Sequence, residues 1–161
     1  MTFDRGAEAL RGVASLVGEA PLRRVMATPG VHEAVRVTVR YHDARSPDSV
    51  ATLTRGVGEA VGLRVVYTRF DDHGAPFDYD FRPESARFAS VLAALRLNRF
   101  DTLDDDPDLP RYGADHWLIE RAAGSFFHDV VLSPASARGH HREIVAALRQ
   151  ALPEALREII N

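Results

Sequence analysis

The stretch VRVTVRY at residues 35–41 decides the fold class more clearly than any other part of the sequence. Its valines and tyrosine alternate with arginines and a threonine, and a two-residue period is typical of a strand with one buried and one solvated face. The segment therefore predicts a β-strand whose polar side chains, Arg36, Thr38 and Arg40, face water.

Two hairpins are expected on the C-terminal side of this strand. Residues 63–70 and the alternating aromatics Phe77, Tyr79 and Phe81 flank the turn sequence DDHG at 71–74. Residues 116–121 and 126–132 flank the turn sequence AGS at 123–125. Strand-forming runs around turn residues of these types predict antiparallel pairs.

Helices are expected where apolar residues recur at three- and four-residue steps, in 7–17, 22–26, 85–97 and from about residue 138 to the C-terminus. A further helix is predicted from Ser46, because the sequence SPDS at 46–49 combines an N-cap serine, a proline at the first position and an acidic residue. Val50, Leu53 and Val57 would lie on one face of this helix, which would end at Gly62. The threonines in the segment, Thr52 and Thr54, also permit a strand.

The predicted order of elements is α-α-β-α-β-β-α-β-β-α. Strand pairs separated by helices favour an α+β fold with a mixed or mainly antiparallel sheet of about five strands and helices packed on a face. A length of 161 residues fits one globular domain spanning residues 1–161.

The composition excludes several kinds of chemistry, because the chain has no lysine and no cysteine. Lysine Schiff bases, P-loop lysines, thiolate nucleophiles, disulfides and cysteine-ligated metals are all ruled out. The use of arginine alone is typical of a GC-rich genome and indicates a bacterial origin. Without cysteine, export signal or long apolar run, the sequence predicts a cytoplasmic protein and no membrane segment.

The charge distribution argues against nucleic-acid binding. Residues 70–120 hold five arginines and twelve acidic residues, a local charge of −7. Phosphate contacts need clustered basic side chains, which an acidic central region does not supply.

An acidic loop offers a candidate metal site. Asp104, Asp106, Asp108 and Asp115 occupy positions 1, 3, 5 and 12 of a twelve-residue calcium loop, where oxygen ligands are required. The loop departs from that pattern because position 6 is Leu109 in place of glycine, and because a strand is expected after it. A solvated acidic connection explains the same residues.

Four histidines are the other titratable candidates. His116 and His128 are expected on partner strands of the second hairpin, where one register would bring them to the same side with Glu120. His140 and His141 begin the last helix, but adjacent helical residues point about 100° apart and do not form a ligand pair.

Two functions fit these features. The first is a non-enzymatic protein-interaction module of the inhibitor, immunity, chaperone-like or adaptor type, binding another protein or a second copy of itself and requiring no cofactor. Its expected anchor residues are Tyr79, Trp117, Leu156, Ile159 and Ile160. The alternative is a small metal-dependent hydrolase or phosphoesterase that binds a divalent cation with aspartates and histidines from loops 71–73, 101–115 and 140–143.

Overall fold

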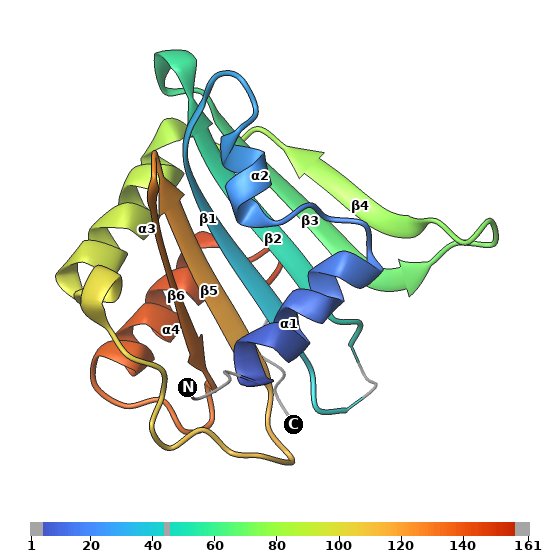
Figure 1. Ribbon diagram of the computed structural model, residues 1–161, viewed down its shortest axis with the longest axis vertical. Helices are drawn as coiled ribbons and strands as arrows, with labels where there is room; N and C mark the ends of the chain where they lie inside the picture. The colour runs from blue at the N-terminus through green and yellow to red at the C-terminus, as the bar shows by residue number, and fades with distance from the viewer. Residues whose placement is uncertain (1–4, 44–45, 157–161) are drawn as a thin grey trace.

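A computed structural model of the chain describes residues 5–43 and 46–156, and its centre is a six-stranded sheet (Figure 1). The strands are β1 (Val31–Arg40), β2 (Ser49–Gly56), β3 (Val61–Phe70), β4 (Pro76–Phe81), β5 (His116–Ala123) and β6 (Phe126–Leu132). They lie in the order β4-β3-β2-β1-β5-β6, and every neighbouring pair is antiparallel. The predicted α+β class and mainly antiparallel sheet are confirmed, with six strands where about five were expected.

Helices cover both faces of this sheet. The helices are α1 (Arg5–Leu16), α2 (Leu22–Met26), α3 (Ser85–Leu97) and α4 (His140–Ala151). Figure 1 shows α1 and α2 in front of the sheet and α3 and α4 behind it. We call the two sides the α1/α2 face and the α3/α4 face.

The main core lies on the α3/α4 face. Phe88 of α3 and Ile144 of α4 are fully buried against strand residues such as Val37, Leu53 and Ile119. The α1/α2 face has smaller apolar clusters, in which Val13 packs near Val50 and Val66, and Leu22 packs near Ala34 and Ala122.

The predicted helix that begins at Ser46 is wrong, because Ser49–Gly56 forms β2, between β1 and β3. Val50 and Leu53 lie on opposite faces of the sheet, in different apolar clusters. A strand buried on both faces has no polar side, so its sequence loses the alternation that identifies a half-buried strand. The β-branched residues of this segment were the correct signal.

The solvated face predicted for residues 35–41 is also wrong in part. Val35, Val37 and Val39 are buried as expected, but Arg36 and Thr38 on the opposite face are each only 1% exposed. They lie beneath the N-terminal helices, whose position over β1 the alternation of one strand does not reveal. Among the described residues, no helix combines the length and apolar composition needed to cross a membrane.

Candidate functional site

A row of polar side chains crosses the whole sheet on its α1/α2 face. Strand register places one residue of each strand in this row, from β4 to β6: Asp80, Arg64, Thr52, Arg36, Glu120 and Asp129. A continuous charged row beneath two helices is the first place to look for chemistry, because perturbed titratable groups concentrate at functional sites.

Arg36 is at the centre of this row and is almost completely buried. Its Nε donates to Thr52 Oγ1 at 2.9 Å, and its Nη1 donates to the backbone oxygen of Ala20 at 2.7 Å. Its Nη2 lies 3.9 Å from a carboxylate oxygen of Glu19, which is long for a hydrogen bond. The guanidinium thus joins the sheet to the segment between α1 and α2.

The remaining charges of the row also pair within the protein. Burial raises the pKa of Glu120, while the charges of Arg36 and Arg11 oppose that rise. Arg11 of α1 lies 3.5 Å from Glu120 and also contacts Asp129. A cavity of about 540 Å³ lies beside the row between α2 and β2–β4, lined by Arg36 and Arg64 among others. Arg64, which borders it, binds Glu19 and Asp80, and Arg36 binds the Ala20 backbone. The row is therefore a structural network that fastens the N-terminal helices to the sheet.

The structure does not bring the four aspartates of the acidic loop together. Asp106 is buried, accepts a 2.6 Å hydrogen bond from the Ser136 hydroxyl and also accepts the backbone N–H of Asp108. Asp115 accepts the backbone N–H of His42 and lies 2.7 Å from its ring nitrogen. Asp104 and Asp108 are exposed. Within residues 5–43 and 46–156, no group of three or more acidic or histidine side chains could hold a metal ion, so the geometry gives the calcium-loop hypothesis no support.

The four histidines do not converge either. In the observed register His128 lies opposite Arg121, which places His128 and His116 on opposite faces of the sheet. His116 and His128 each bond a backbone oxygen, of Pro110 and Leu103 respectively. The rings of the other two bond different partners, His140 the Asn98 side chain and His141 the Asp104 backbone oxygen. Each of the four imidazoles thus holds a loop or helix end in place.

The predicted anchor residues divide into three groups. Trp117 and Leu156 are each 3% exposed and belong to the main core, so neither side chain is presented to a partner. Ile159 and Ile160 lie outside the described residues. Of the three described anchors, Tyr79 alone lies on the surface, with 50% of the residue exposed.

Tyr79 belongs to a larger exposed group on β4. Phe77 and Phe81 point to the same side of the strand as Tyr79, and they are 39% and 37% exposed. We call these three side chains the aromatic edge surface. Strand register places Tyr79 opposite Val65 and Phe81 opposite Leu63, so the surface extends the α3/α4 face beyond its helices. The sequence alternation predicted that these three aromatics share one side of a strand, and Tyr79 was named there as an anchor.

A cleft of about 580 Å³ borders the aromatic edge surface. Its other walls come from Tyr41, Tyr67, Arg69 and the Glu154–Ala155 segment beyond α4. The Tyr67 hydroxyl donates to the Glu154 backbone oxygen at 2.8 Å and holds that segment against the sheet. Burial, followed in effect by the charge of Asp115, raises the pKa of Tyr41, so its hydroxyl stays protonated at neutral pH. An apolar cleft with a few polar groups at its border is suited to binding rather than to proton transfer.

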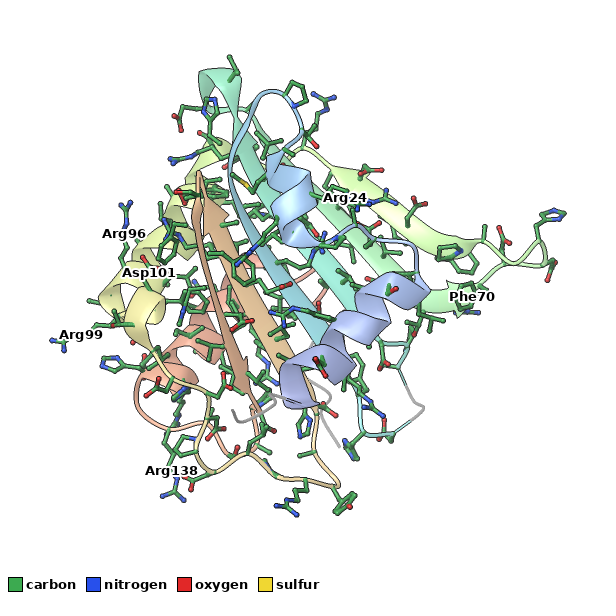
Figure 2. All side chains as sticks on the ribbon, viewed as in Figure 1. Arg24, Phe70, Arg96, Arg99, Asp101 and Arg138 are labelled. Atoms are coloured by element: carbon green, nitrogen blue, oxygen red, sulfur yellow. The ribbon has the colours of Figure 1, made fainter. Side chains whose placement is uncertain are left out.

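The two edges of the sheet differ in how they are closed. At the β6 edge, the Val131 N–H donates to the Asp105 side chain at 2.8 Å, and the Val131 oxygen accepts the N–H of Asp106 at 2.9 Å. The acidic loop therefore covers this edge at Val131. In the described part of the chain, no segment pairs with the outer side of β4. Figure 1 shows the β3–β4 hairpin projecting from the body, and in Figure 2 Phe70, the last residue of β3, lies next to the hairpin turn, far from Arg99 and Arg138 on the opposite side.

No protein-family model matches the chain, and comparison with curated protein sequences finds no similar protein. The function is therefore argued from the geometry alone.

Proposed function

We propose that this chain is a non-enzymatic protein-interaction module that binds its partner through the aromatic edge surface and the adjoining cleft. The observation that carries the proposal is the exposure of Phe77, Tyr79 and Phe81 together on one side of β4, the strand at the edge of the sheet. Large aromatic side chains gathered at a surface are typical anchors of protein interfaces. The cysteine-free, arginine-only composition favours action in a bacterial cytoplasm as part of the same proposal.

The distribution of the titratable groups supports a binding function over the hydrolase alternative. The three loops that a metal-dependent hydrolase would use do not all meet. The loop at 101–115 contacts His141 through the Asp104 backbone oxygen, but residues 71–73 form the tip of the projecting hairpin (Figure 1). Asp105, Asp106 and Asp115 of the loop at 101–115, and the histidines at 140–141, are engaged in hydrogen bonds that fix loops. The exposed aromatics have no comparable structural task.

The proposal is tested by affinity capture from cells of the chain's own source, with the wild type and with the variant Tyr79→Ala. Tyr79 is half exposed at an edge, so its removal changes the free energy of unfolding by less than about 1 kcal/mol. The matched control is Tyr112→Ala, because Tyr112 is 90% exposed but lies in the acidic loop. We expect one protein to be retained by the wild type and by Tyr112→Ala and lost with Tyr79→Ala. Equal retention by all three would contradict the proposal.

A further inference from the structure

We infer that the partner of this surface is an extended segment of another protein, with alternating apolar and basic side chains, that adds to the sheet as a seventh strand beside β4. This inference rests on the proposed function and specifies what the binding surface recognises. It follows from three properties of β4, which are its open edge, its two chemically distinct sides and its excess of negative charge.

The open edge supplies main-chain hydrogen-bonding groups. In an antiparallel sheet, an edge strand presents the N–H and C=O groups of alternate residues outward, and an extended peptide can pair with them. Every residue of β4 is at least partly exposed, so no other part of the described chain covers the strand where an added strand would lie. The opposite edge at β6 is bonded to the acidic loop at Val131, so a strand added there would have to displace the loop. In the described part of the chain, β4 has no such segment beside it.

The two sides of β4 determine the side chains of the added strand. Phe77, Tyr79 and Phe81 point to the α3/α4 face, whereas Asp78 and Asp80 point to the α1/α2 face. Residues directly opposite each other in neighbouring strands share a face. An added strand would therefore place its apolar residues beside the aromatics and its intervening residues beside the two carboxylates.

The carboxylates on β4 are only partly neutralised within the protein. Arg64 lies 2.8 Å from Asp78 and 3.2 Å from Asp80, and it also lies 3.0 Å from Glu19. One guanidinium thus serves three carboxylates. The side chains of Asp78 and Asp80 remain 48% and 75% exposed, so basic residues of an added strand would find both accessible.

The same charges disfavour a second copy of this chain as the occupant. Two copies of β4 can pair antiparallel about a twofold axis. Most of the strand overlaps only if that axis passes through the pair at Asp78 or at Tyr79. The first register sets Asp78 opposite the Asp78 of the other copy, and the second sets each Asp78 opposite an Asp80. Like charges directly opposite destabilise a strand pair. A heterologous basic segment meets no such repulsion.

The inference is tested with synthetic peptides and the full chain, by fluorescence anisotropy. The probe is a labelled seven-residue peptide that alternates valine and arginine, with valine at both ends. Comparison peptides have glutamate in place of arginine, or the same composition with all valines before all arginines. We expect binding of the alternating basic peptide, weaker binding at high salt, and weaker or no binding of the two comparison peptides.

Variants of the chain test the role of the carboxylates. The double variant Asp78→Asn/Asp80→Asn removes two negative charges from β4, and the control Asp72→Asn/Glu84→Gln removes two from exposed positions that flank the strand. We expect the first to weaken binding of the alternating peptide by roughly 2- to 30-fold, the range that two cross-strand charge pairs span, and the control to have a smaller effect.

Backbone methylation separates strand addition from simple charge attraction. Two further peptides carry N-methyl groups on alternate amides, one on each set, and only one set can face β4. We expect one methylated peptide to lose binding and the other to retain it. Equal binding of both, absence of binding by the alternating peptide, or equal effects of the two double variants would overturn the inference. If Asp78→Asn/Asp80→Asn instead self-associates and shows no peptide preference, the carboxylates only protect the edge, and the inference also fails.

Failure of this inference can be distinguished from failure of the proposed function. A cellular partner lost with Tyr79→Ala, together with failure of the peptide tests, would leave the interaction module standing and remove the strand-addition mode. Peptide binding as expected, without any cellular partner that depends on Tyr79, would retain the recognition mode and contradict the assigned function.

Discussion

Arg36 carries its charge in the middle of the sheet, where one side-chain oxygen and one backbone oxygen accept its hydrogen bonds. Glu120 lies opposite it on β5. Removing one member of a buried charged network leaves its partners desolvated and unpaired. We therefore expect Arg36→Ala to lower the free energy of unfolding by about 3–5 kcal/mol, measured by urea denaturation. The control is Arg96→Ala on the exposed surface of α3, which we expect to change it by less than about 0.5 kcal/mol.

The double variant Arg36→Met/Glu120→Gln tests whether these two residues act as a pair. Because both charges leave together, we expect the loss to be smaller than the sum of the two single losses. Strict additivity, or a loss below about 1 kcal/mol for Arg36→Ala, would contradict the assignment of the polar row to fold stability.

Asp106 gives the fold a defined dependence on pH. Burial by itself raises the pKa of this carboxyl, but hydrogen bonds from the Ser136 hydroxyl and from the N–H groups of Asp108 and Ser133 outweigh it and leave the pKa below its ordinary value of 3.8. A carboxyl whose folded pKa is depressed stabilises the protein above its ordinary value, and that contribution is lost as pH falls through the folded pKa. Asp106 thus stabilises the folded protein fully at neutral pH.

We expect Asp106→Asn to lower the free energy of unfolding by about 1–3 kcal/mol at pH 7, because the loop amides and Ser136 lose their charged acceptor. Urea denaturation from neutral to acid pH should show that the difference in the free energy of unfolding between wild type and variant shrinks below the ordinary carboxyl pKa. If this difference did not change with pH, the charge of Asp106 would not be the cause of its stabilisation of the loop.

At the scale of elements, the start of β1 and the end of β2 make a close backbone approach that no pattern of apolar residues reveals. A Cβ at Gly56 would lie 2.4 Å from the backbone oxygen of Gly30, which accepts the N–H of Val57 at 3.1 Å. We expect Gly56→Ala to destabilise the protein by about 1–3 kcal/mol, since backbone must move to relieve the contact. The matched control is Gly12→Ala within α1, where a Cβ meets open space.

That control should stabilise the protein by about 0.5–1 kcal/mol, because alanine is a better helix former than glycine. The two variants are compared by thermal and urea unfolding. Equal effects of the same sign would contradict the close approach at the start of β1.

The elements that the sequence predicted well are those with one buried face or strong turn signals. Both hairpins and four of the five predicted helices are confirmed, because turn residues and three- to four-residue periods depend on local spacing. The segment that forms β2 was not identified as a strand, because burial on both faces removes the alternation and SPDS at 46–49 resembles a helix start. Arg36 could not be identified as buried, since only the position of α1 and α2 covers it.

The candidate surface was predicted in part for a similar reason. The alternation of Phe77, Tyr79 and Phe81 showed that they share one side of a strand, and Tyr79 was named as an anchor. Whether that side meets a helix depends on where α3 and α4 end relative to β4, which is a property of the tertiary structure. Trp117 and Leu156 carried the same apolar signal and belong to the core.

At the scale of the whole molecule, the sheet is closed on three sides and open on one. Helices cover the two faces, the acidic loop bonds the β6 edge, and β4 extends past both layers with aromatic side chains on one side and carboxylates on the other (Figure 1). The described histidines and acidic loop residues serve mainly to fix loops, as their hydrogen bonds show. We therefore propose that this one edge carries the function.

Site-specific photo-crosslinking tests that claim most directly. A benzophenone amino acid replaces Tyr79 in one protein and Tyr112 in another, and both are irradiated in cells of the chain's own source. The account predicts one discrete adduct with a different protein from position 79 and none of that kind from position 112. Adducts of the same pattern from both positions, or a discrete adduct from position 112 with none from position 79, would contradict it.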